Sequence, residues 1–246
     1  MEIIDSFCCI GVQPEDDRAL DERTLLDQMQ CAGVAEALCI HFAAVRYDTR
    51  LGNDELLATC ASHSRLHPLA AINPTPYVGV ADEIRRCAAR GCRGVRFAPG
   101  RQGWSMGSAP FVHALEIAAE SGLPVSVETG GSGEPTQLAA LAQGLSVPVI
   151  LAAVSYATLG EAIAAMQRNP NLLLEACRLA TPDVVELLVA EVGAKRLLFA
   201  SGAPGWEIAP TLEMIRQADV SAAEIQAILG GNARRVYHLA PTGGAA

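Results

Sequence analysis

The chain has 246 residues, of which 50% are hydrophobic and 18% are charged, and its formal net charge is −9. The hydrophobic share is enough to fill a large core, and the length suits one α/β barrel or two small domains. The negative charge, with an isoelectric point near 5.0, argues against nucleic acid or an anionic membrane as the main partner. No apolar run approaches the ~20 residues that span a bilayer.

Two further features concern the cellular compartment. Residues 1–5 lack the basic start and the apolar stretch of a signal peptide, which predicts a cytoplasmic location. The eight cysteines are scattered along the chain without a C-x-x-C pair. This pattern predicts reduced thiols that mostly pack as small buried hydrophobes.

Short apolar strands alternate with amphipathic helices along the chain. Asp21 is placed to cap the first helix. Thr181 and Pro182 have the form of a helix start, with Thr at the cap and Pro at the first helical position. The predicted strands are 2–11, 34–41, 66–72, 92–97, 123–129, 147–154, 171–177 and 195–201. The predicted helices are 21–32, 54–62, 80–90, 108–121, 135–145, 158–169, one that starts at 181, 209–218, 221–229 and 232–239.

This alternation predicts the α/β class with parallel strands. Eight strand–helix units in this length fit a single (β/α)8 TIM barrel over residues 1–240, with extra C-terminal helices. Residues 241–246 are predicted to form a disordered tail. In such a barrel the active site lies at the C-terminal ends of the strands.

The longer predicted loops all follow strands and therefore lie at the mouth of this barrel. Trp104 and Trp206 lie in two of them, where they either wall a pocket or cover the barrel top or a subunit contact. Residues of one parity share a strand face, so Asp5, Phe7 and Cys9 are predicted to face the same way. The four loops are 42–53, 99–109, 130–134 and 202–207.

Several short motifs, in order and spacing, resemble the amidohydrolase-related (amidohydrolase 2) family of metal-dependent TIM-barrel hydrolases and decarboxylases. The resemblance runs from the first strand to the terminal helix. It implies a divalent metal, usually zinc, held by a His-x-His pair on strand one, a His after each of strands five and six, and an Asp after strand eight. The motifs are Ile3–Gly11, Ala70–Pro74, Gly91–Pro99, Gly122–Val125, Lys195–Pro204 and Ile228–Val236.

The five positions that match this ligand set hold Phe7, Cys9, Glu128, Ala153 and Gly202. None of them is one of the expected histidines or the expected aspartate, and three of the five side chains offer no metal donor. We therefore expect no metal and no other cofactor. The alternative is a rebuilt zinc site, because Cys, His and carboxylate are acceptable zinc ligands. Its candidate ligands are Cys9, His41, Glu128 and Cys177.

A carboxylate at the barrel mouth needs a partner, or it will protonate. Arg96, at the end of the neighbouring fourth strand, is predicted to reach Glu128 and to supply the positive charge once supplied by metal. The pair either fills an emptied site as a buried ion pair, or it binds a small polar ligand with Glu128 as acid or base. A nucleophilic cysteine at Cys8 or Cys9 would need a base or a positive setting. Two thiols packing the barrel is the alternative.

These residues lead us to expect a degenerate family member. In this hypothesis the barrel is a pseudoenzyme that forms a homo- or hetero-dimer with an amidohydrolase-like subunit and supports a catalytically complete homologue. One alternative is a small-ligand-binding protein. Another is a metal-independent hydrolase or lyase that acts on a small polar or carboxylated substrate with Glu128 and Arg96. The residues expected to contact the ligand are Phe7, Cys9, His41, Trp104, Ala153, Cys177, Gly202 and Trp206.

Overall fold

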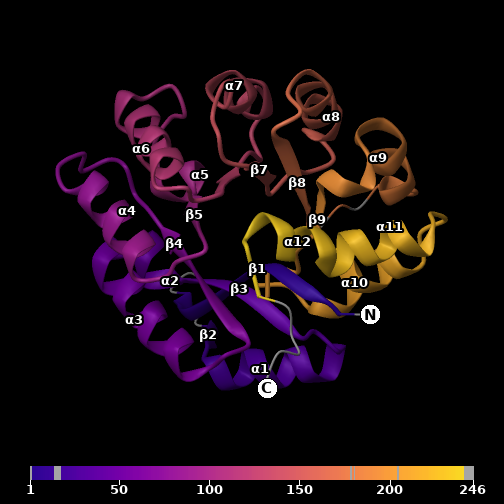
Figure 1. Cartoon of the computed structure of the whole chain (residues 1–246), viewed down its shortest axis with the longest axis horizontal. Helices are drawn as coiled ribbons and strands as arrows, with labels where there is room; N and C mark the ends of the chain where they lie inside the picture. The colour runs from indigo at the N-terminus through magenta and orange to yellow at the C-terminus, as the bar shows by residue number, and fades with distance from the viewer. Residues whose placement is uncertain (1, 14–17, 178, 180, 204, 241–246) are drawn as a thin grey trace.

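The structure is a computed structural model, and it describes residues 2–13, 18–177, 179, 181–203 and 205–240. Eight parallel strands surround the centre of the molecule and helices lie outside them (Figure 1). The strands of the ring are β1 (Ile4–Gln13), β3 (Glu36–His41), β4 (Leu66–Ala71), β5 (Gly94–Phe97), β6 (Val125–Glu128), β7 (Val149–Ala152), β8 (Leu172–Ala176) and β9 (Leu197–Phe199).

Hydrogen bonds between β1 and the end of β9 bring the two sides of the ring together. The Cys9 N–H donates to the Ala203 carbonyl at 2.7 Å, and the Gly202 N–H donates to the Phe7 carbonyl at 3.0 Å. Lower on the strand, the Ser6 hydroxyl donates to the Phe199 carbonyl at 2.7 Å. The predicted (β/α)8 TIM barrel is therefore confirmed, with its strands in chain order around the ring.

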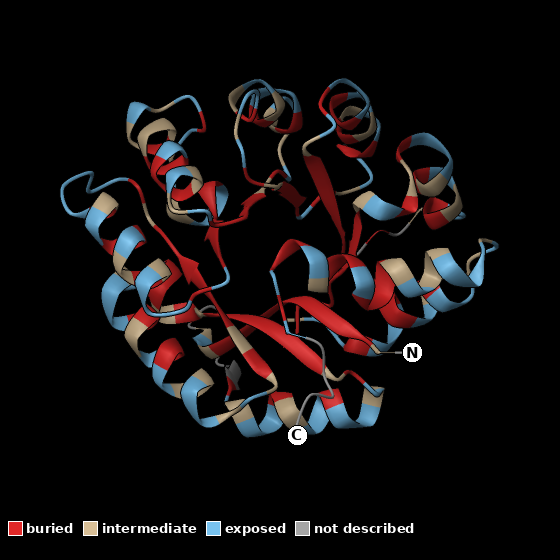
Figure 2. Ribbon diagram, viewed as in Figure 1, coloured by how far each residue is buried: buried red, intermediate tan, exposed pale blue. Residues whose placement is uncertain are grey.

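The helices cover the outside of the barrel, with buried faces toward the strands and exposed faces toward solvent (Figure 2). This arrangement follows from the helical spacing of their apolar residues. The helices of the described chain, including those at the two ends of the barrel, are α1 (Glu22–Ala32), α2 (Phe42–Arg46), α3 (Thr49–Ser62), α4 (Val80–Ala89), α5 (Pro99–Gln102), α6 (Ala109–Glu120), α7 (Glu134–Leu141), α8 (Leu159–Arg168), α9 (Val184–Val192), η1 (Ala194–Arg196), α10 (Ile208–Arg216), α11 (Ala222–Gln226), η2 (Ala227–Gly231) and α12 (Asn232–Val236).

Helix starts follow their capping residues. The predicted cap at Asp21 is confirmed, because its carboxylate accepts the Thr24 N–H at 2.7 Å. Helix α3 starts earlier than expected, because Asp48 caps it by accepting the Leu51 N–H at 2.7 Å. The prediction that the next-to-last barrel helix starts at Thr181 is wrong. That helix starts at Val184, because the preceding Asp183 has a left-handed φ of 51° that interrupts helical geometry.

Three short elements, the helices α2 and α5 and a strand β2 (Arg18–Leu20), were not predicted from the sequence. Helices α2 and α5 lie in the segments after β3 and β5, and α3 takes up the rest of the first of these segments. Strand β2 pairs antiparallel with the end of β1. Each is five residues or shorter, so none spans enough residues to show a periodic pattern. All of them lie at the barrel mouth.

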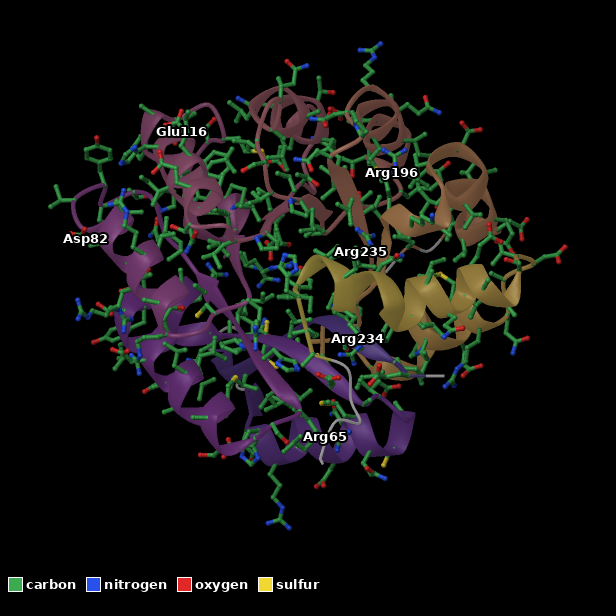
Figure 3. All side chains as sticks on the ribbon, viewed as in Figure 1. Arg65, Asp82, Glu116, Arg196, Arg234 and Arg235 are labelled. Atoms are coloured by element: carbon green, nitrogen blue, oxygen red, sulfur yellow. The ribbon has the colours of Figure 1, made fainter. Side chains whose placement is uncertain are left out.

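The opposite end of the barrel is closed by the C-terminal helices. The two helices predicted there form one continuous run of α11, the π-helical η2 and α12. Gly230 lies so close to the start of β1 that a Cβ on it would stand 2.5 Å from the Glu2 carbonyl oxygen. On α12, near the centre of the view in Figure 3, Arg234 pairs with Glu2 at 2.6 Å and with Glu36 at 2.5 Å. These contacts fix the closed end and leave the other end for a site.

The remaining expectations concern thiols, the tail and the membrane. All eight cysteines are free, and six of them are buried. No helix in the described part of the chain is long and apolar enough to cross a membrane. The tail predicted at 241–246 lies outside the described residues.

Candidate functional site

A cavity of about 260 Å³ opens at the C-terminal ends of the barrel strands. Its walls come from β1, β5, β6 and β8 and from the segments that follow β3, β5, β7 and β9. Ten residues were singled out from the sequence, and eight of them line this cavity. These eight are Phe7, Cys9, Arg96, Glu128, Ala153, Cys177, Gly202 and Trp206.

The centre of the site is the guanidinium of Arg96, a residue that is 3% exposed as a whole. Its Nη1 donates to both carboxylate oxygens of Glu175 at 3.0 Å and to the Ser126 hydroxyl at 2.9 Å. The Phe7 ring lies against its face, with the guanidinium carbon 3.3 Å from the ring centroid, as in a cation–π contact. Burial alone would lower the pKa of Arg96, but Glu175 and Glu128 outweigh it and raise that pKa. Arg96 is therefore a fixed positive charge.

Glu128 lies between two arginines, one of which is Arg96, the residue that was predicted to reach it. Its Oε1 is 3.6 Å from Nη2 of Arg96, and its Oε2 accepts from Nε of Arg101 at 3.3 Å. The side chain of Glu128 is 15% exposed and that of Arg101 is 41% exposed. The site thus holds an inner, fully buried pair and an outer pair that reaches the pocket opening.

Two charged residues of the site were missed by sequence reasoning. Glu175 is the nearer carboxylate partner of Arg96, and it lies two residues before Cys177 in an otherwise apolar strand segment. Because residues two apart on a strand share a face, the predicted pocket residue Cys177 could have indicated that Glu175 also faces the barrel interior. Arg101 lies in α5, where one turn of helix carries no pattern that would single out an arginine.

The prediction that Asp5, Phe7 and Cys9 share one face of the first strand is wrong. The register of β1 with β3 shifts between Asp5 and Cys8. Asp5 therefore lies with Cys8, whose thiol donates to it at 3.2 Å, and not with Phe7 and Cys9 in the pocket. Burial raises the pKa of the Cys9 thiol despite the nearby Arg96 and Arg101. Cys9 is therefore held as a thiol, which is a weak nucleophile.

His41 and Trp104 lie outside the cavity that they were expected to line. His41 caps α2, where its Nδ1 accepts the Ala43 N–H at 3.2 Å, and its Nε2 is 3.3 Å from Glu55. Trp104 donates to the Gln102 side chain at 3.0 Å. Its ring packs on Phe111, with centroids 4.8 Å apart. Both residues hold the walls of the mouth from outside.

The side chains present do not fit the metal ligand set that the family resemblance implies. Gly202, at the expected aspartate position, has a φ of 73°, and a Cβ there would lie 3.2 Å from both the Cys177 sulfur and the Trp206 ring. Ala153 also has a left-handed φ, of 55°. Within the described ranges, no group of three or more His, Cys, Asp or Glu could hold a metal ion. The rebuilt zinc site has no geometric support there.

Comparison with known proteins places the chain in a family. A family model described as Amidohydrolase matches residues 11–239, and the chain therefore belongs to the amidohydrolase family. No curated protein matches the chain.

Similar solved structures include 5-carboxyvanillate decarboxylase from Sphingomonas paucimobilis, with 16% identity, a TM-score of 0.77, and coverage of 97% of this chain and 99% of that chain. The 2,6-dihydroxybenzoate decarboxylase from Rhizobium has 16% identity, a TM-score of 0.78 and coverage of 97% and 99%. A 5-carboxyvanillate decarboxylase from Novosphingobium aromaticivorans, complexed with manganese, has 14% identity, a TM-score of 0.76 and coverage of 97% and 96%. At this identity the likeness shows the fold.

Proposed function

We propose that this chain is an amidohydrolase-family barrel that works without a divalent metal and binds a small carboxylated molecule at its mouth. In this proposal it is a pseudoenzyme, and its bound ligand serves recognition and not turnover. The observation that carries the proposal is the buried Arg96, which is paired with Glu175 and stacked on Phe7. A resident guanidinium repels a divalent cation and already uses the nearby carboxylates.

The lining of the cavity supports a planar anionic ligand. Phe42 and Trp206 supply aromatic surface, which suits a flat ring. Arg101 supplies a partly exposed guanidinium, whose planar fork matches a carboxylate. Two of the similar structures are named as decarboxylases of aromatic acids, 5-carboxyvanillate and 2,6-dihydroxybenzoate. An acid of this size is the first probe to try.

Calorimetric titration of the untagged protein with 2,6-dihydroxybenzoate, with and without EDTA, tests this proposal. We expect the same dissociation constant in both buffers and no release of CO2 on long incubation. Binding that EDTA abolishes and manganese restores would contradict the proposal. This outcome would show that ligand binding needs a metal ion, although the carboxylates of the site are paired with arginines.

A second candidate function is a metal-independent hydrolase or lyase. It is favoured by the position of Glu128, a partly exposed carboxylate within reach of two arginines, which is a suitable setting for an acid or base. Turnover of a carboxylated substrate that survives chelator but is lost in Glu128→Gln would support it. Glu116→Gln, on the exposed face of α6, is the matched control and should leave turnover unchanged.

The proposed pseudoenzyme would also pair with a catalytically complete homologue. An inherited dimer surface would let a non-catalytic barrel stabilise or regulate a metal-bearing subunit of the same family. Co-expression followed by affinity capture of the tagged chain tests it. Recovery of a metal-containing amidohydrolase subunit in a constant ratio supports a hetero-dimer, and a homo-dimer or monomer by light scattering contradicts that assignment.

A further inference from the structure

Among the residues that the structure describes, four charged side chains line the cavity, and their burial differs. The side chains of Arg96 and Glu175 are 2% and 0% exposed and share two hydrogen bonds at 3.0 Å. Glu128 is 15% exposed and lies between the two arginines. Arg101 is 41% exposed, and its contact with Glu128 is 3.3 Å long. Of these four described side chains, Arg101 is therefore the one most exposed to solvent.

The backbone that carries Arg101 is anchored, although its side chain is not enclosed. Arg46 of α2 donates to the Arg101 carbonyl at 2.6 Å. The next residue, Gln102, donates to the Val45 carbonyl at 3.3 Å and accepts from the Trp104 indole at 3.0 Å. Helix α5 is thus tied to α2 on one side and to the wall of the mouth on the other. An anchored backbone that carries an exposed guanidinium suits a residue whose side chain exchanges one carboxylate partner for another.

We propose that Arg101 is the residue that recognises the ligand, and that it does so by exchanging partners. In the free protein its guanidinium neutralises Glu128, and on binding it turns to the carboxylate of the small molecule while Arg96 stays with Glu175. An exposed ion pair with one long contact is weak and easily exchanged. A buried, hydrogen-bonded pair is not, because separating it leaves an uncompensated charge. This inference rests on the proposed function of the cavity as a site for a carboxylated molecule.

Exchange of partners by Arg101 and direct binding of the ligand by Glu128 predict opposite effects of removing the Glu128 charge. Because Glu128 and the ligand compete for Arg101, removal of the Glu128 charge should tighten binding of an acid. If Glu128 instead held the ligand itself, the same change would weaken binding. The Phe42 ring, whose centroid is 6.0 Å from the Arg101 guanidinium carbon, lies within reach of an aromatic acid held by Arg101.

Two probes that differ by one carboxylate separate these cases: 2,6-dihydroxybenzoate and resorcinol, titrated calorimetrically into the full chain. We expect Arg101→Met to weaken binding of the acid about tenfold or more, and to leave resorcinol binding within about twofold. Glu128→Gln should tighten binding of the acid by about threefold to tenfold. The matched control is Arg216→Met, which removes an exposed arginine paired with Glu213 on α10 and should change neither constant.

The outcomes are distinct. Unchanged binding of the acid to Arg101→Met, or weaker binding to Glu128→Gln, would overturn the role of Arg101 while the proposed function stands. A wild-type protein that binds neither probe would contradict both the proposed function and the role of Arg101. Arg101→Lys refines the result, because a lysine keeps the charge but loses the planar fork, so we expect an intermediate affinity.

Discussion

The buried charges inside the mouth depend on the guanidinium of Arg96. It stands between the Phe7 ring and the Glu175 carboxylate, and both are buried. A carboxylate buried to this degree without a counter-charge is unfavourable by several kcal/mol. The stability of the barrel and the proposed metal-free binding of an acid therefore both depend on the Arg96 side chain.

We predict that Arg96→Met lowers the free energy of unfolding by about 3–5 kcal/mol, because it leaves Glu175 buried and unpaired. The double change Arg96→Met with Glu175→Gln should recover part of this loss, since it removes the unpaired charge as well. Urea denaturation measures both. The control is Arg85→Met, whose exposed pair with Glu120 is 3.8 Å long and should contribute less than about 1 kcal/mol. A loss no larger than that of the control would contradict this role for Arg96.

Asp5 is the second residue with a testable energetic signature. Burial, only partly offset by hydrogen bonds from Ser201, Cys8 and Phe7, raises the pKa of Asp5 to about 6. The folded state therefore binds this proton more tightly than the unfolded state does. The free energy of unfolding should fall as pH rises from about 4 to about 6, by roughly 3 kcal/mol in total.

Urea denaturation of wild type and Asp5→Asn at several pH values isolates this contribution, because the variant lacks the titrating group. We expect the stability of wild type relative to the variant to decline across that window and to level off above it. Asp27→Asn, on the exposed side of α1, controls for the loss of one negative charge. A flat difference between pH 4 and pH 6 would show that Asp5 does not bind its proton more tightly in the folded state.

At the scale of elements, the position of Arg101 depends on the packing of α2 on α3. Gly52 of α3 lies against α2 so closely that a Cβ on it would stand 2.1 Å from the Ala44 nitrogen and 2.6 Å from its Cα. Only glycine allows this approach. Helix α2 then carries Arg46, whose guanidinium holds the carbonyl of Arg101. A contact on the outer helices is thereby linked to the pocket.

Gly52→Ala should lower the free energy of unfolding by about 1–3 kcal/mol, because the added methyl forces the two helices apart. It should also weaken binding of 2,6-dihydroxybenzoate, since α5 loses its support. The matched control is Gly160→Ala in α8, where a Cβ meets nothing within 4 Å. That variant should keep its affinity and gain up to about 1 kcal/mol of stability. Equal stability and affinity in the two variants would rule out the helix packing as a support for the site.

At the scale of the whole molecule, the fold could be predicted from sequence because strand and helix patterns alternate from one end of the barrel domain to the other. A barrel brings all strand ends to one mouth, so Phe7, Glu128 and Cys177 could be placed there from their positions in the strands alone. The short elements α2, α5 and β2 could not, because each is too short to show a period. These elements shape the mouth, which is why the site was predicted less well than the barrel.

The ion pairs inside the mouth could be predicted only in part: the contact of Arg96 with Glu128 was expected, whereas Glu175 and Arg101 were not. Arg96 has two carboxylates within reach, and parity alone does not decide which is nearer. His41 was placed at a strand end, but a local turn of α2 uses its ring as a helix cap. The strand position of a residue thus predicts its level in the barrel, whereas its partner depends on three-dimensional packing.

The metal content of the untagged protein, purified without chelator and measured by elemental mass spectrometry, tests whether the site works without metal. A site whose carboxylates already pair with Arg96 and Arg101 predicts zinc, manganese and iron each well below one atom per chain. The same preparation should still bind 2,6-dihydroxybenzoate. Near-stoichiometric metal that survives dialysis, and that is lost together with acid binding on chelation, would contradict a site that binds its ligand without metal.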